Sequence, residues 1–310
     1  MNSPSISIIL PTHNRAPLLA RAMRSVLAQS DPEFEVVVID DGSGDDTPQV
    51  LASFAAADSR VRLLRNEAPQ RVAAARNRAI RAATGEWMAC LDDDDEMLPD
   101  YVARLRQHLR AVPEAGLVWT GVERVHHNST PPRREIEVWH HRWDGKTPIV
   151  HKFLLMYSQS FGVATRRSAM INAGLFDEQS SSIEDIDLAM RLLVAGTPYA
   201  ALPEVLIRVH LGEVVSLSRS SDNRSNLRLR LLNNNMTFLQ TQPMLLAHYR
   251  LFALSGLYRD GRLPEARALV TALLRSGRIS GRAFETILRY EVFEPIRRLF
   301  RPKAGAAPHA

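Results

Sequence analysis

Four consecutive aspartates, Asp92 to Asp95, have the clearest potential for chemistry in this sequence. Adjacent carboxylates repel one another, so a site that holds them together normally recruits a cation. Oxygen-only ligands select hard divalent ions such as Mg²⁺ or Mn²⁺, which complete their coordination with water and substrate phosphates. The run therefore predicts a metal site for a phosphate-containing substrate, and a solvated acidic turn is the alternative.

Two other ligand sites do not fit the sequence. In a calcium loop counted from Asp92, the sixth position would be Met97 instead of glycine and the twelfth Ala103 instead of glutamate. A dinucleotide-binding turn needs Gly-x-Gly-x-x-Gly after the first strand, and no such run follows Leu10. We therefore expect neither an EF-hand nor a dinucleotide-binding site.

The sequence predicts alternating strands and helices around the acidic run, and these elements determine where it lies. Short apolar runs predict strands at 5–10, 35–40, 61–64, 87–91 and 117–122, with helices between the first four and another from Pro99. Such alternation builds a parallel sheet, and ligands bind beyond the carboxyl ends of its strands. The polar segments at these ends are Pro11–Arg15, Asp40–Ser43 and Asp92–Glu96.

Between about residues 123 and 148 the periodicity fades, and we expect an irregular segment that lies over the site. The pairs His126-His127 and His140-His141 fall within it. No helical or strand spacing brings these histidines together, so we interpret them as loop residues. A second metal site is the alternative.

Composition limits the class of protein. A chain of 310 residues with 45% hydrophobic residues can form a full core. The single cysteine, Cys90, excludes a disulfide framework and favours a reducing compartment. There is no basic leader, and no stretch approaches the roughly 18 apolar residues of a membrane-spanning helix. We expect a cytoplasmic protein that could also bind peripherally at the inner face of the membrane.

Charge is uneven along the chain. The net charge is +5, but residues from Ser221 onward contain 15 Lys and Arg against 6 Asp and Glu. This asymmetry favours a region that faces something anionic, such as a bilayer surface or a partner protein, and a solvated helical face is the alternative. From Asn226 the pattern is mostly helical, so we expect a helical extension over 221–303 for a peripheral membrane contact or a homodimer. We expect residues 304–310 to be a disordered tail.

An ordered set of motifs resembles the family 2 inverting glycosyltransferases of GT-A fold. The segments are SISIILPTHNR from Ser5, VIDDGS from Val38, ARN from Ala75, and LDDDD from Leu91 with Pro99 behind it. The resemblance covers roughly residues 5–215. It implies an α/β fold with a mostly parallel, Rossmann-like sheet flanked by helices, and a catalytic domain over 1–220. The nucleotide-sugar half would be about 1–115 and the acceptor half about 116–220.

The resemblance also implies roles on the donor side. The first loop and the turn after the second strand would hold base and ribose, and Arg76 would reach base or phosphate unless it lies on a helix surface. The implied nucleotide-sugar-binding residues are Pro11, Thr12, His13, Asn14, Arg15, Asp40, Asp41, Arg76, Asp92 and Asp93. The implied ligands of Mg²⁺ or Mn²⁺ are Asp94, the main one, with Asp92 and His210.

The segment Glu184-Asp185-Ile186-Asp187-Leu188 is similar to the family's catalytic-base segment, so the resemblance implies Asp185 as the base. Glu184, Asp187 and Arg191 would support the base or face the acceptor. A Ser182-x-x-Asp185 helix cap is the structural alternative, and the two roles are compatible.

The implied activity is that of a hexosyltransferase-type enzyme. It would transfer a sugar from a nucleotide-diphosphate sugar, preferably a UDP-sugar, to a hydroxyl of a glycan, lipid-linked or protein acceptor. Cell-surface polysaccharide or glycolipid synthesis would be the setting, and we expect no nucleic-acid partner. The alternatives are a nucleotidyltransferase and a catalytically silent nucleotide-sugar-binding or assembly protein.

Overall fold

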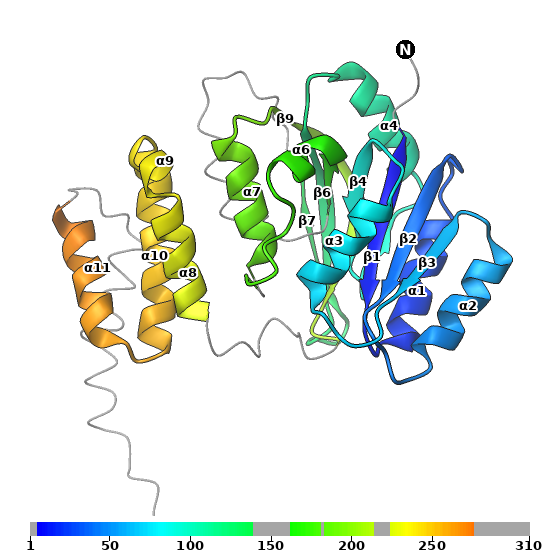
Figure 1. Cartoon of the computed structure of the whole chain (residues 1–310), viewed down its shortest axis with the longest axis horizontal. Helices are drawn as coiled ribbons and strands as arrows, with labels where there is room; N and C mark the ends of the chain where they lie inside the picture. The colour runs from blue at the N-terminus through cyan, green and yellow to red at the C-terminus, as the bar shows by residue number, and fades with distance from the viewer. Residues whose placement is uncertain (1–4, 139–161, 181–182, 214–223, 276–310) are drawn as a thin grey trace, which may run out of the picture. The chain divides into compact units, whose positions relative to one another are not determined.

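The computed structural model describes residues 5–138, 162–180, 183–213 and 224–275. The chain divides into two compact units, Met1–Ser221 and Asp222–Ala310. The first unit is an α/β sheet structure and the described part of the second is helical (Figure 1).

The first half of the sheet is parallel, with strand order β3-β2-β1-β4. Continuous apolar runs form these strands, and β1 is buried along its whole length, as expected for a parallel strand covered on both faces. The elements are β1 (Ile6–Thr12), α1 (Ala16–Leu27), β2 (Phe34–Asp40), α2 (Thr47–Ala57), β3 (Val61–Arg65), α3 (Val72–Ala82) and β4 (Trp87–Cys90). All four strands were predicted, and each begins and ends within two residues of its predicted bounds.

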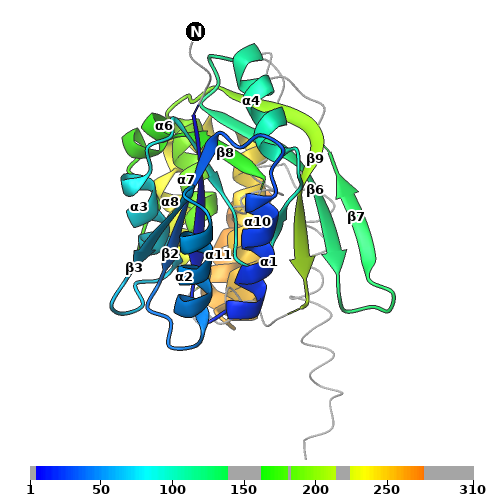
Figure 2. The ribbon, with the colours of Figure 1, turned by 90° about the vertical axis from the view of Figure 1, so that its right-hand side faces the viewer.

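The second half continues the same sheet in the order β4-β8-β6-β9-β5, with β7 on β6. Strand β8 pairs antiparallel with β4 and β6, whereas β6 and β9 are parallel. Figure 2 shows β6, β7 and β9 side by side. The elements are β5 (Glu96–Met97), α4 (Tyr101–Ala111), β6 (Leu117–His126), β7 (Arg133–Glu137), β8 (Val163–Arg166), α6 (Arg167–Asn172), α7 (Glu184–Val194) and β9 (Tyr199–Leu211).

The prediction of an irregular segment after residue 123 was wrong over its described part. Strand β6 runs on to His126 and pairs with β7. Ion pairs such as Arg134–Glu123 at 2.9 Å and Arg124–Glu137 stabilise this hairpin in place of apolar contacts. The charged residues on both strands therefore hid the hydrophobic periodicity by which a strand is predicted. Residues 139–148, including His140 and His141, lie outside the described residues.

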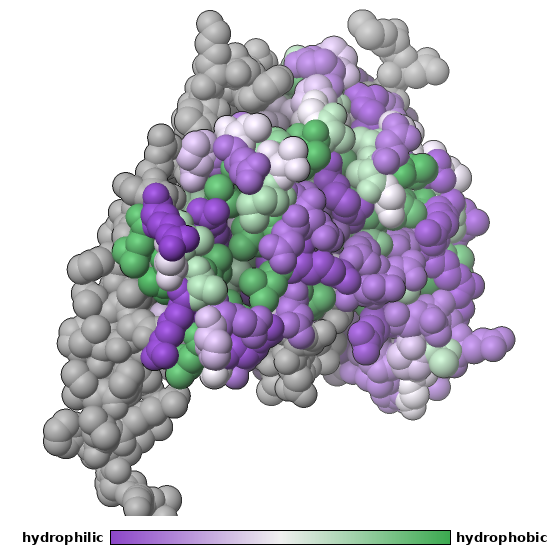
Figure 3. Space-filling view, turned by 60° about the vertical axis from the view of Figure 1, so that its left-hand side comes forward, coloured by the Kyte–Doolittle hydropathy of each residue, from purple (hydrophilic) through white to green (hydrophobic). Residues whose placement is uncertain are grey.

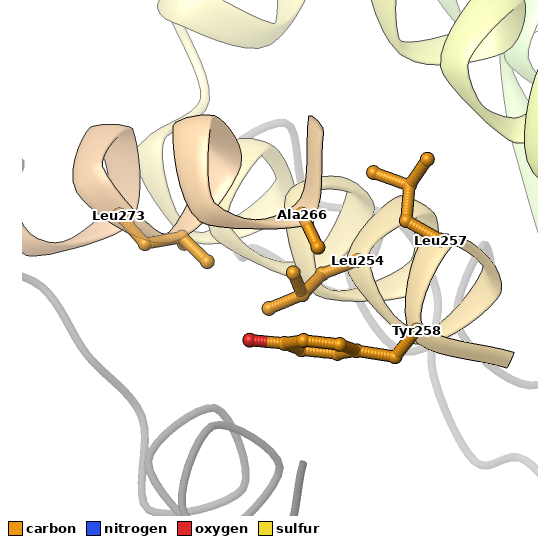
Figure 4. Close-up of a cluster of buried hydrophobic side chains, with 5 residues drawn as sticks. All are labelled: Leu254, Leu257, Tyr258, Ala266 and Leu273. Atoms are coloured by element: carbon orange, nitrogen blue, oxygen red, sulfur yellow. The ribbon is translucent and has the colours of Figure 1, made fainter. Parts of the chain in front are cut away.

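The second unit has a core of its own. Leu254, Leu257 and Tyr258 of α10 pack against Ala266 and Leu273 of α11 (Figure 4). The two helices are joined at Gly261, whose φ of 72° is the left-handed conformation that glycine adopts readily after a helix end. The described helices are α8 (Arg224–Asn234), α9 (Met236–Gln240), α10 (Pro243–Arg259) and α11 (Leu263–Arg275).

None of the described helices combines the length and the apolar character that a bilayer span requires. On the face that Figure 3 shows, hydrophilic side chains cover much of the described surface, with hydrophobic areas among them. Exposed apolar residues of this kind are normal on protein surfaces.

Candidate active site

The carboxyl ends of three parallel strands lie together. The backbone N–H of Asp41, after β2, donates to Thr12 O at the end of β1 over 2.9 Å. On the other side of β1, Leu91 N, after β4, donates to Ile9 O over 3.0 Å. The three polar segments predicted from the sequence therefore meet at one edge of the sheet.

The loop after β1 is interlocked with the turn after β2. His13 Nδ1 donates to the carbonyl oxygen of Asp41 over 2.9 Å, and Asn14 N donates to Ser43 Oγ over 2.9 Å. Asn14 Oδ1 accepts from Gly44 N over 2.8 Å. Asn14 has a φ of 53°, a left-handed conformation in which asparagine is enriched. These bonds make one polar platform from the two segments; Pro11 lies buried in β1 beneath it.

Asp40 bonds the backbone of the turn after β2. Its Oδ1 accepts from Ser43 N over 2.9 Å, and its Oδ2 lies 2.8 Å from Arg65 Nη1. The Asp40 side chain is buried, so these contacts offset the desolvation of its charge.

Asp41 organises the loop after β3. Its carboxylate accepts from Asn66 Nδ2 over 2.6 Å and from the backbone N–H groups of Gln70 and Arg71, each over 2.9 Å. A carboxylate offers about four acceptor sites, so three are used by the chain. Among the contacts of the described residues, Asp41 therefore has about one acceptor site left.

In the acidic run, Asp93 and Asp94 face the loop after β1. Asp93 accepts from Thr12 Oγ1 over 2.7 Å and from Arg15 Nη1 over 3.1 Å. The same Arg15 nitrogen donates to Asp94 Oδ2 over 2.7 Å. Burial raises the pKa of Asp93 to about 6, although the Arg15 charge opposes this shift, and burial also raises the pKa of Asp94.

Carboxylate oxygens of Asp92, Asp94 and Asp95 lie within 4.8 Å of one another, so this donor set fits a hard divalent ion. Asp95 is buried and accepts from the backbone N–H of His210 over 3.0 Å. Burial, followed by repulsion from Asp92 and Asp94, raises the pKa of Asp95 well above its ordinary value. The structure brings the predicted ligands Asp92 and Asp94 together and adds Asp95, which was not among the predicted ligands.

The His210 ring contacts a different group of side chains. Its Nε2 donates to Glu96 Oε2 over 2.8 Å, which leaves Nδ1 as the acceptor, 2.8 Å from His127 Nε2. The two imidazole rings are stacked with centroids 5.1 Å apart. His127, His210 and Glu213 form a second group of closely spaced ligand atoms. The structure thus places the His210 backbone at the acidic run but its ring in a different cluster.

The sequence predicts His127 to be a loop residue, with a second metal site as the alternative, and does not connect it to His210. His127 directly follows β6, and the parallel pairing of β6 with β9 places Val125 opposite His210. Only this long-range register brings His127 to His210, so no local spacing could have identified it. His126, interpreted as a loop residue, is instead the last residue of β6, and its Nε2 pairs with Glu135 over 3.0 Å.

Arg76 does not lie on a helix surface, because its side chain is only 3% exposed. Its contact with a base or phosphate stays a prediction. Nη2 pairs with Asp92 Oδ1 over 2.5 Å and Nη1 with Glu184 Oε1 over 3.1 Å. The carboxylate neighbours raise the pKa of Arg76 despite its burial, so the guanidinium stays charged. Arg76 therefore connects the acidic run to the start of α7.

Asp185 lies half-buried in the first turn of α7. Its Oδ1 accepts from Ile186 N over 2.8 Å. Desolvation, followed by repulsion from Glu184, raises the pKa of Asp185 well above its ordinary value, and Arg76 opposes this. The N-cap of α7 is Ile183, without a side-chain cap, so the helix-cap alternative is not supported; Ser182 lies outside the described residues.

Asp187 and Arg191 support the segment before α7. They form an ion pair of 2.8 Å, and Arg191 Nη2 donates to the carbonyl oxygen of Leu175 over 2.7 Å. Asn77, from the ARN motif, holds the same segment from α3 by bonding the backbone N–H and carbonyl of Phe176, each over 2.9 Å. Asp187 and Arg191 thus attach α7 to the segment that precedes it.

Several curated relatives match about a third of the chain. The succinoglycan biosynthesis protein ExoO of Rhizobium meliloti is 41% identical over 113 residues, which are 36% of this chain and 31% of that protein. A GalNAc(5)-diNAcBac-PP-undecaprenol beta-1,3-glucosyltransferase of Campylobacter jejuni is 36% identical over 105 residues, 34% of each protein. This chain therefore spans about a third of the length of these relatives.

Solved structures share the fold over almost the whole chain. S. aureus TarS 1-349 in complex with UDP-GlcNAc matches with a TM-score of 0.63 at 16% identity, covering 96% of this chain and 93% of that one. The mannosyltransferase PcManGT from Pyrobaculum calidifontis, in complex with GDP-Man and Mn²⁺, matches with a TM-score of 0.54 at 20% identity, covering 97% and 89%. These neighbours confirm the predicted GT-A fold.

The sequence model described as "Glycosyl transferase family 2" matches residues 7–173, more than half of the chain. The match contains the three polar segments and the ARN motif, whereas Asp185 and His210 lie beyond its end. The chain belongs to glycosyl transferase family 2.

Proposed function

We propose that the protein is an inverting, hexosyltransferase-type glycosyltransferase that moves a sugar from a UDP-sugar to an acceptor hydroxyl. One observation carries this proposal: Arg76 connects Asp92, in the group that we propose as the cation site, to Glu184, the neighbour of Asp185. The carboxylates suited to a cation that binds the leaving diphosphate, and the carboxylate suited to remove a proton, thus lie on either side of the buried Arg76 guanidinium. Transfer of a sugar to a hydroxyl needs both functions.

On the donor side, Asp94 and Asp92 would ligate Mg²⁺ or Mn²⁺. Three close carboxylates, two of them with raised pKa values, support this role, since a cation relieves their repulsion. When bound, the ion supplies Lewis-acid stabilisation of the diphosphate. The platform of His13 and Asn14, with Asp41, would hold base and ribose. The solved relatives with UDP-GlcNAc and with GDP-Man and Mn²⁺ favour such a donor.

Asp185 would act as the general base. Its half-buried position and raised pKa suit this role, because a carboxylate with a raised pKa is a stronger base than one with the ordinary value. The acceptor oxygen would lose its proton to Asp185 as it attacks the anomeric carbon from the side opposite the diphosphate. The configuration at that carbon inverts as a result.

The acceptor would be a glycan or a lipid-linked saccharide in cell-surface polysaccharide synthesis, at the cytoplasmic face of the membrane. The names of the relatives from R. meliloti and C. jejuni favour this class. The helices of the second unit would provide a peripheral membrane contact or a dimer interface. Liposome flotation of the full chain and of a chain ending near Ser220 tests the membrane contact, and equal flotation of both would exclude it.

The activity is tested with a panel of nucleotide sugars, with and without Mn²⁺, by measuring nucleotide release and the anomeric configuration of the product. We expect cation-dependent release from UDP-sugars and an inverted product. Asp185→Asn should lower transfer by about 10²- to 10⁴-fold while donor binding persists. Asp46→Asn, at an exposed position, is the matched control.

Other results would point to other functions. Pyrophosphate release from a nucleoside triphosphate would indicate a nucleotidyltransferase. Donor binding without turnover on any acceptor would indicate a silent binding protein. Unchanged transfer by Asp185→Asn would remove Asp185 as the base.

A further inference from the structure

Arg76 is buried among more negative charge than it can neutralise. One guanidinium contacts two carboxylates, Asp92 and Glu184, and Asp185 follows Glu184 directly. A buried charge is tolerated only when partners compensate it, so the position of Arg76 depends on both carboxylates. Its Nε has no hydrogen-bond partner among the described residues, and the Phe176 ring lies 5.5 Å from the guanidinium carbon. The two ion pairs are thus its main polar anchors.

We propose that Arg76 is a positioning residue, which holds the start of α7, and with it Asp185, through Glu184. This inference rests on the proposed function, in which Asp185 is the base. Arg76 itself is buried and acts through other residues, so it is not a catalytic residue. Glu184 is the link, because its Oε1 receives Nη1 of Arg76 at the position next to Asp185.

Three charged groups from three elements act on Asp185. They are Glu184 on the same helix, Arg76 on α3 and Asp92 after β4. Glu184 and Asp92 raise the pKa of Asp185, whereas Arg76 lowers it. Loss of the Arg76 charge should therefore raise this pKa further, and loss of the Glu184 charge should lower it. The two substitutions are expected to have opposite effects.

The geometry of Arg76 is separable from its charge. Nη1 bonds Glu184 and Nη2 bonds Asp92, so the planar fork holds two carboxylates in fixed directions. A lysine carries the same charge on a single nitrogen and does not reproduce this fork. Arg76→Lys should keep the charge effect on Asp185 but loosen the start of α7, whereas Arg76→Gln should lose both.

The experiment measures kcat and KM against pH, from about pH 5 to 9, for the full chain with saturating UDP-sugar and Mn²⁺. In the Arg76→Gln variant the acid limb of kcat should move to higher pH, and in Glu184→Gln to lower pH, each by about one unit. Arg76→Lys should keep the wild-type limb with kcat lowered about tenfold. Arg81→Gln, at an exposed position on the same helix, should match the wild type.

Thermal unfolding and UDP binding identify variants that fail to fold. If Arg76→Gln does not fold, Glu184→Gln carries the test alone, because its side chain is nearly isosteric. The proposal would be overturned if the acid limbs of kcat in Arg76→Gln and Glu184→Gln moved in the same direction, or if neither moved. Transfer by Asp185→Asn at the wild-type rate would instead refute the base assignment, so failure of this inference and failure of the proposed function are distinguishable.

Discussion

Arg15, in the loop after β1, donates to Asp94, in the acidic run after β4, over 2.7 Å. The guanidinium therefore occupies one oxygen of a carboxylate that we propose as a metal ligand. Unit charges about 4 Å apart interact by about 4 kcal/mol at the effective dielectric constant near a protein surface, so a fixed cation here weakens the binding of a second one.

Arg15→Gln should bind Mn²⁺ more tightly in the absence of donor. We expect a gain of about tenfold, which corresponds to about 1.4 kcal/mol. Titration calorimetry with Mn²⁺ measures it, and Arg24→Gln, exposed on α1, is the control. Unchanged or weaker Mn²⁺ binding would show that Arg15 does not compete with the ion.

Asp93→Asn should change how stability depends on pH. The folded-state pKa of Asp93 is raised to about 6 from 3.8, so the folded protein binds the proton more tightly than the unfolded chain. The wild type therefore loses stability as pH rises from about 4 to about 6, by at most about 3 kcal/mol for two pKa units. Asparagine does not titrate, so the variant should gain stability relative to the wild type over this interval.

Urea denaturation at pH 4.5 and at pH 7, without divalent ions, measures this difference. The Asp93→Asn variant also loses part of its contacts with Thr12 and Arg15. The ion pair with Arg15 exists in the wild type only when Asp93 is charged, and its effect is already contained in the folded-state pKa of Asp93. A stability difference between variant and wild type that is independent of pH would contradict the prediction.

Gly42→Ala should disrupt the turn that carries Asp41. Gly42 has a φ of 74°, and an added Cβ would lie 2.9 Å from the backbone of Ala68 and Pro69. Strain of this kind costs about 1 to 3 kcal/mol. We expect a lower melting temperature and UDP binding weakened several-fold. Gly44→Ala is the matched control, because nothing lies within 4 Å of its Cβ position, and equal effects of the two would exclude steric strain as the cause.

His127→Ala should lower kcat/KM, whereas His126→Ala should not. His127 holds Nδ1 of His210, whose backbone N–H bonds Asp95 in the acidic run. His126, the preceding residue, pairs with Glu135 and has no such contact among the described residues. Steady-state kinetics at several Mn²⁺ concentrations measure the effect, which we expect to be several-fold. Equal kinetics of the two variants would show that the His127 contact has no influence on the site.

The first four strands were predictable because each is a short, continuous apolar run. Their order in the chain also placed Asp40, Asp41 and the acidic run at one edge of the sheet, where the structure has them. Local pattern sufficed here, because helix-connected parallel strands bring their carboxyl ends together whatever the detailed packing.

The contacts of Arg76 and His127 could not be predicted in the same way. Arg76 meets Glu184 from 108 positions away, and His127 meets His210 from 83. Both depend on how α7 and β9 pack onto the first half, which no local spacing encodes. The β7 strand was missed because four of its five residues are charged and none of them is fully buried, so it lacks the apolar run that predicted the other strands.

Strand β9 lies between β6 and β5 in the sheet, although it follows both by more than 70 residues. The family match ends at residue 173, before this strand begins. A chimera joined at that boundary would place a foreign strand beside β6 and would separate Asp95 from its partner His210. Exchange of acceptor specificity between relatives should therefore keep β9 with its own N-terminal half and change only the segments that connect the strands.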